Sequence, residues 1–157
     1  MTDTENLQLI REVAIRYVGA RRRVAEKISS PPEAARYFRR RIHDDAREHL
    51  VALYLDGRHR AIADAIVSIG TATASLVHPR EVFQPAIGLG ACAVLIGHNH
   101  PSGDPNPSPE DISVTRRLAD AGRLLGVPVL DHIVWTASGG FVSIREVESG
   151  IFAAAPD

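Results

Sequence analysis

Two histidines and an aspartate lie close together in the segment GHNHPSGDPNPSPED, which follows an apolar stretch. His98 and His100 are two positions apart, so an extended backbone would point both imidazoles to the same side. Asp111 would lie in the first turn of a helix if Ser108 is the N-cap and Pro109 the first helical residue. Two imidazoles and a carboxylate make a three-ligand zinc site that leaves a fourth position for water. The segment therefore predicts a metal site, with zinc as the expected ion.

The same residues also have an ordinary structural interpretation. Ser108 and Asp111 form a common helix-capping pair, and PSGDPNPSP has the composition of a surface turn. An isolated H-x-H is more often a pair of core or surface histidines than a metal site. The combination favours a metal, because a strand end, H-x-H, a stiff loop and a capped helix with an acid occur together.

A hydrolytic zinc site also needs a base that is not itself a ligand. Glu48 immediately precedes the apolar stretch LVALYLD, and it could reach the end of a neighbouring strand if the two strands are adjacent. On spacing alone, a solvated acid at a helix end is the more common role for such a residue. The spacing thus leaves the identity of the base open.

Helices and strands are predicted to alternate around these residues. The resulting α/β fold has a mixed β-sheet flanked by helices, in a single domain over residues 30–157. Residues 1–29 are expected to form an N-terminal helix and a linker. The predicted helices are 5–18, one opened by Pro31-Pro32 and reaching Ala46, one beginning near Pro79 and 112–125; the predicted strands are 50–56 and 61–70 as a hairpin, 91–96, VPVLDHIVW and GGFVSI.

Composition restricts the partners and the compartment. The 18 Lys and Arg against 19 Asp and Glu give a net charge of -1, so bulk charge does not indicate nucleic acid or an anionic membrane as a partner. No apolar run approaches the roughly 18 residues of a membrane span. The N-terminus has no signal-peptide pattern, and Cys92 has no second cysteine to pair with. These features predict a soluble cytoplasmic protein. Cys92 falls within the apolar stretch 91–96 and is expected to be a small core residue of that strand.

The motifs resemble a known family. The pattern H-x-H-P, six residues, then S-x-x-D resembles the JAB/JAMM (MPN-plus) metalloprotease domain. More narrowly, GHNHPSG, VHPREVF and RRLADAGRLLGVPVLDHIV resemble the RadC family. The resemblance covers roughly residues 30–152. It is closest to the short RadC-like proteins, because full-length RadC proteins also carry an N-terminal helix-hairpin-helix.

The resemblance implies a fold like that of the cytidine deaminases and a zinc ion held by His98, His100 and Asp111. It also implies that Ser108 donates a hydrogen bond to a developing oxyanion. The upstream acid of the motif corresponds best to Glu48, which would act as the base in hydrolysis of a peptide or isopeptide bond in a protein substrate. The resemblance thus changes the preferred interpretation of Glu48 from a solvated acid to a catalytic one.

Other functions remain to be compared with hydrolysis. A nucleobase deaminase needs H-x-E and P-C-x-x-C, which a chain with one cysteine lacks. The stronger alternative is a non-catalytic metal-binding module of RadC type that contacts DNA through the basic clusters 21–23 and 39–41. In the family phrase LDHIV, Asp131 and His132 either support a zinc ligand or form a buried polar pair elsewhere. His78 is expected to be structural, near the start of its helix.

Overall fold

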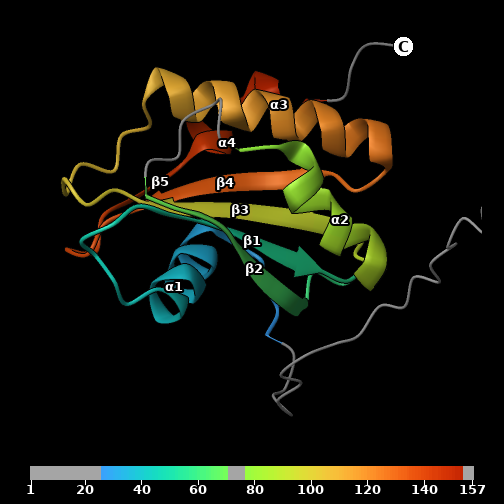
Figure 1. Ribbon diagram of the computed structural model, residues 1–157, viewed down its shortest axis with the longest axis horizontal. Helices are drawn as coiled ribbons and strands as arrows, with labels where there is room; N and C mark the ends of the chain where they lie inside the picture. Colours follow the sequence, from blue (N-terminus) through green and yellow to red (C-terminus); the bar gives the residue numbers. More distant parts are fainter. Residues whose placement is uncertain (1–25, 71–76, 154–157) are drawn as a thin grey trace, which may run out of the picture.

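The structure is a computed structural model that describes residues 26–70 and 77–153 (Figure 1). Its centre is a five-stranded sheet in the order β2-β1-β3-β4-β5. The pairs β1–β2, β1–β3 and β4–β5 are antiparallel and β3–β4 is parallel, so the predicted mixed sheet is confirmed. The helices are α1 (Pro31–Arg41), α2 (Pro79–Leu89), α3 (Pro109–Leu125) and α4 (Ile144–Val147), with a 3-10 turn at Ser149–Ile151; the strands are β1 (His49–Leu55), β2 (Ala61–Ile69), β3 (Ala93–Asn99), β4 (Val129–Trp135) and β5 (Phe141–Ser143).

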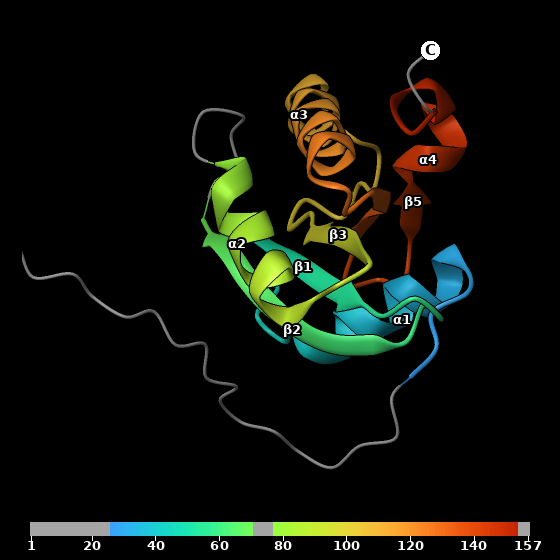
Figure 2. The same ribbon diagram turned by 90° about the vertical axis from the view of Figure 1, so that its right-hand side faces the viewer.

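Helices cover both faces of this sheet. Figure 2 shows α1 on one face and α2 and α3 on the other. On the α1 face, Phe38 stacks on Trp135 with ring centroids 5.4 Å apart. On the opposite face, Phe83 of α2 and Leu118 of α3 pack against alternate residues of β1 and β3. The sheet is therefore buried on both sides, which explains why every residue of β1 and β3 is buried and why both strands are nearly continuous in apolar residues.

The parallel pair β3–β4 is connected through α3, which lies across the sheet (Figure 1). Such a crossover brings the end of the first strand close to the start of the helix. His98 lies at the end of β3, and Ser108 is the N-cap of α3. The βαβ unit therefore brings the two halves of the sequence motif together.

Two expectations from the sequence are wrong. Helix α1 ends at Arg41 rather than Ala46, because the backbone is extended at Ile42. The Asp44 carboxylate also accepts the Ala46 N–H at 3.0 Å. This local side-chain bond competes with the helical one. Cys92 is exposed and precedes β3, where its N–H donates to the Leu55 carbonyl at 2.8 Å. It is therefore a residue at the sheet end beside the hairpin, not a core residue of the strand.

The remaining expectations concern His78, the N-terminal residues and membrane-spanning helices. His78 is the N-cap of α2, as expected. The predicted helix of residues 5–18 and the basic cluster 21–23 lie outside the described residues. Within the described ranges, none of the helices combines the length and apolar character needed to cross a membrane.

Candidate metal centre

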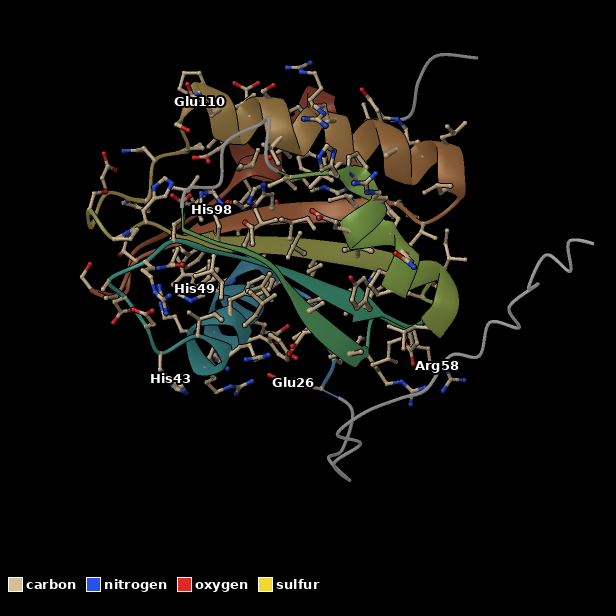
Figure 3. The ribbon with its side chains drawn as sticks, viewed as in Figure 1. Glu26, His43, His49, Arg58, His98 and Glu110 are labelled. Carbon is tan, nitrogen blue, oxygen red and sulfur yellow. The ribbon has the colours of Figure 1, made fainter. Side chains whose placement is uncertain are left out.

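Three elements meet at one end of the sheet to form a cluster of two imidazoles and two carboxylates. His98 is the penultimate residue of β3, and His100 follows the strand directly. Asp111 is the third residue of α3, after the N-cap Ser108 and the opening proline. Glu48 directly precedes β1, which is the neighbour of β3 in the sheet. Figure 3 labels His98 and Glu110 at this end of the molecule.

The donor atoms of these four side chains converge. His98 Nε2 lies 2.9 Å from His100 Nε2 and 3.2 Å from Asp111 Oδ1. His100 Nε2 lies 3.1 Å from Asp111 Oδ2, and His98 Nε2 lies 3.6 Å from Glu48 Oε1. One ligand atom from each of the four residues lies within 4.8 Å of all the others. The structure thus brings together every residue that the sequence motif pointed to as a ligand or base.

The chemistry of this donor set fits a zinc ion. Donors about 2.1 Å from a tetrahedral ion lie roughly 3.4 Å from one another, close to the separations among His98, His100 and Asp111. His100 Nδ1 is 2.7 Å from the Asp104 carbonyl oxygen, which can only accept a hydrogen bond. In the neutral imidazole the proton is then on Nδ1, and Nε2 offers a lone pair to the centre of the cluster. His98, His100 and Asp111 could therefore hold the ion, with Glu48 beside it.

The pKa values of His100 and Asp111 depend on the contacts between these two residues. The hydrogen bond with Asp111 raises the pKa of His100, although burial opposes this effect. Burial alone would raise the pKa of Asp111, but the bonds from His100, His98 and the Ser108 N–H outweigh it and hold that pKa well below its usual range. These shifts favour a proton on His100 beside an ionised Asp111. A metal ion would replace this proton as the positive charge of the site.

Glu48 has a different environment from Asp111. Partial burial raises the pKa of its carboxyl group, and the nearby Asp111 adds to the rise, while His98 opposes it. A carboxylate with a raised pKa accepts a proton more readily, which suits a general base. Its side chain is 22% exposed, whereas that of His98 is fully buried. Glu48 therefore lies on the solvent-facing side of the cluster.

Asn99 fixes the backbone on both sides of Glu48. The Asn99 side-chain carbonyl accepts the His49 N–H at 2.7 Å, and its amide donates to the Arg47 carbonyl at 2.8 Å. The Glu48 carbonyl in turn accepts the Gly70 N–H at 2.8 Å. The middle residue of the H-N-H tripeptide thus points away from the two imidazoles, as the strand pattern predicts, and ties the start of β1 to the end of β3. No sequence pattern indicates this role beyond the position of an amide between two candidate ligands.

The Asp131–His132 pair divides between two places, because neighbouring residues of a strand face opposite sides of the sheet. His132 Nε2 lies 2.7 Å from His98 Nδ1, and burial lowers the pKa of His132 well below its usual value. Asp131 instead accepts hydrogen bonds from Ser143 Oγ at 2.6 Å and from the Arg145 N–H at 3.0 Å. His132 therefore contacts a candidate ligand, and Asp131 joins β4 to β5 and α4.

Thr115 was not singled out from the sequence. Its hydroxyl lies 2.6 Å from His132 Nδ1 and donates to the Asp111 carbonyl at 2.6 Å. The only available signal was its position one helical turn after Asp111.

Ser108 caps α3 reciprocally with Asp111. Its Oγ accepts the Asp111 N–H at 3.1 Å, and its own N–H donates to Asp111 Oδ2 at 2.7 Å. The capping interpretation and the metal interpretation of this pair are therefore compatible, because the cap itself orients the carboxylate. A hydroxyl oxygen that accepts one bond still has its own proton to donate.

The second basic cluster binds its own chain. Arg39 donates to the Thr136, Gly139 and Gly140 carbonyls. Arg40 pairs with Glu26, and Arg41 pairs with Asp64 at 2.8 Å. Each of the three arginines therefore has a partner within the chain, and residues 21–23 of the other basic cluster lie outside the described residues.

Comparisons with known proteins agree with the motif. Bacterial and archaeal relatives named "UPF0758 protein" are similar over most of the chain: one from Syntrophotalea carbinolica is 44% identical over 140 residues (89% of this chain, 61% of the relative). One from Shouchella clausii is 48% identical over 126 residues (80% and 54%), and one from Methanosarcina mazei is 43% identical over 120 residues (76% and 52%). The chain thus spans about half to three-fifths of the length of these curated relatives. The RadC-like JAB domain matches residues 28–150, and the chain belongs to this family.

Proposed function

We propose that this protein is a zinc-dependent hydrolase of the JAMM type that cleaves a peptide or isopeptide bond in a protein substrate. The observation that carries the proposal is the convergence of two imidazole Nε2 atoms and a capped carboxylate, with a further carboxylate beside them on the solvent side. Three ligands and an adjacent base are the parts that metal-assisted hydrolysis needs. The single thiol, Cys92, suits a reducing cytoplasm, where we place the protein.

The residues of the chain divide the work of hydrolysis. When bound by His98, His100 and Asp111, zinc would supply a Lewis acid that polarises the scissile carbonyl and acidifies the attacking water. Glu48 takes a proton from that water while the water oxygen adds to the carbonyl carbon. Glu48 then passes the proton to the leaving nitrogen as the C–N bond breaks, so that an acid and an amine are released. Ser108 donates a hydrogen bond from its hydroxyl to the oxyanion that develops on the carbonyl oxygen.

The first test is the metal content of untagged protein purified without added metal, measured by plasma mass spectrometry. We expect about one zinc per chain in the parent and none in His98→Ala/His100→Ala. Absence of metal from both proteins, even after reconstitution with zinc, would refute the metal centre.

The second test separates hydrolysis from metal binding. Glu48→Gln removes the proton acceptor but keeps the shape of the side chain, so the variant should retain zinc and lose hydrolysis by about 10²–10⁴-fold. The measurement uses a library of internally quenched peptides and lysine isopeptides. An unimpaired Glu48→Gln variant would remove Glu48 from the base role. A parent that holds zinc but cleaves no member of the library would favour the non-catalytic metal-binding module with a DNA-associated role.

A further inference from the structure

Behind the candidate ligand His98 lies a chain of three buried hydrogen bonds. His98 Nδ1 is 2.7 Å from His132 Nε2, His132 Nδ1 is 2.6 Å from Thr115 Oγ1, and Thr115 Oγ1 is 2.6 Å from the Asp111 carbonyl oxygen. The three residues that form these bonds, His98, His132 and Thr115, are each at most 1% exposed. Solvent therefore cannot replace any of these bonds, and each proton must have a definite position.

The direction of every bond follows from the last one. A backbone carbonyl oxygen has no proton, so the short contact between it and Thr115 must use the threonine hydroxyl proton. Thr115 Oγ1 then has only lone pairs for His132, and the proton between them belongs to His132 Nδ1. A neutral His132 consequently has a lone pair on Nε2, which accepts the proton of His98 Nδ1. The same sequence of bonds leaves His98 Nε2 without a proton in the neutral ring.

We infer that Thr115 and His132 are positioning residues that hold His98 in its Nδ1-protonated tautomer, with the Nε2 lone pair directed at the centre of the cluster. The opposite tautomer would place an N–H where His100 Nε2 lies 2.9 Å away and would exclude a cation from that position. For metal binding the inference rests on the proposed function. The proton positions themselves are a property of the metal-free chain.

We call the hydrogen bonds that run from His98 through His132 and Thr115 to the Asp111 carbonyl the relay. The relay also couples two candidate ligands to each other. It ends on the backbone carbonyl of Asp111, whose carboxylate faces His98 Nε2 at 3.2 Å from the other side. His98 and Asp111 are thus joined both through the relay and across the cluster. His100 has a simpler arrangement, because its Nδ1 meets the Asp104 carbonyl of the loop at 2.7 Å. We therefore assign the relay to the buried half of the site.

The tautomer is tested directly by nitrogen-15 NMR of the histidine rings in metal-free protein, at a pH where the rings are neutral. In the parent we expect the His98 proton on Nδ1 and an unprotonated Nε2. A parent in which His98 carries its proton on Nε2 would overturn the inference without any substitution. This measurement remains decisive even if the zinc proposal fails.

The effect on metal binding is tested with Thr115→Val, which keeps the shape of the side chain and removes the hydroxyl. Zinc affinity, measured by competition with a chromogenic chelator, should fall about 10–100-fold in Thr115→Val and in His132→Gln. Thr115→Ser retains the hydroxyl and should stay within about threefold of the parent. Parental zinc affinity in a folded Thr115→Val or His132→Gln variant would refute the positioning role. A parent that binds no zinc would instead refute the proposed function.

Discussion

A hydrogen-bonded carboxylate lies near each end of β1, but the partners of these two carboxylates differ. At the hairpin end, Asp56 accepts bonds from the Arg58 N–H at 2.8 Å, the Arg60 N–H at 2.9 Å and Arg60 Nε at 2.7 Å. At the other end, Asp111 of α3 faces His98 Nε2 and His100 Nε2, and the Nδ1 atom of each ring lies at hydrogen-bond distance from another partner. Figure 3 shows His98 and Arg58 at these opposite ends.

The comparison distinguishes a structural polar cluster from a binding one. Each contact of Asp56 joins an acceptor to a group that has a proton, so the turn is complete by itself. In the cluster of His98, His100 and Asp111, neutral rings would set lone pairs against lone pairs. Such an arrangement is stable only with an additional positive charge, which is either a retained proton or a metal ion.

The largest expected effect is the response of thermal stability to zinc. A ligand that binds only the folded state at 1,000 times its Kd stabilises it by about 4.1 kcal/mol. We expect zinc to raise the Tm of the parent by several degrees and to leave His98→Ala/His100→Ala unchanged, as measured by scanning calorimetry. Asp56→Asn is the matched control at the other end of β1, and it should respond to zinc as the parent does. An equal response in the double alanine variant would show that zinc binds elsewhere.

The packing of α1 against β3 beside the candidate metal cluster is tested by Gly97→Ala. A Cβ at Gly97 would lie 2.6 Å from the Phe38 ring, which is itself stacked on Trp135. Because α1 and the sheet are tightly packed here, the substitution should lower the free energy of unfolding by about 3 kcal/mol. Urea denaturation of the parent and the variant measures the difference. A loss below about 0.5 kcal/mol would mean that the strand before His98 shifts easily.

Asn99→Ala tests the attachment of Glu48 with a smaller expected cost. The substitution removes both side-chain bonds to the backbone around Glu48 and leaves the His49 N–H without its acceptor. The free energy of unfolding should fall by about 2 kcal/mol, and zinc content should be retained because Asn99 points away from the ligands. Denaturation and plasma mass spectrometry on one preparation check the two statements. Loss of zinc would show that Asn99 supports the ligands rather than the base.

The smallest effect is expected at the hairpin end. The Arg60 N–H is the main cause that lowers the pKa of Asp56, with the other donors of the turn adding to it. A folded-state pKa below the unfolded value of about 3.9 gives stability that is present above that value and is lost as the pH falls through the folded pKa. Asp56→Asn should therefore have a slightly lower Tm than the parent at pH 6, and the gap should close in acid. A gap that is independent of pH would contradict this account.

The sequence could predict most of the elements and the residues of the candidate metal cluster because their signals are local. Helix caps, apolar periodicity and the spacing of His98, His100 and Asp111 all lie within short segments. Asn99 and Thr115 could not be assigned in this way, since their partners come from β1 and β4, and the pairing of these strands with β3 is a long-range property. The premature end of α1 had a weak local signal in Asp44, whose side chain bonds the backbone two residues later. The position of Cys92 depended on a strand boundary, which apolar runs define poorly.

The short β3–α3 connection has a consequence for the unfolded chain. His98 and His100 are two positions apart, and Asp111 follows His100 by 11 positions, so bringing the three together costs little loop-closure entropy. A denatured molecule can consequently still chelate zinc through this segment, whereas His132 is 34 positions from His98 and joins only on folding. Zinc should therefore stabilise the native state by less than its affinity for that state suggests, because part of the binding energy also favours the denatured ensemble.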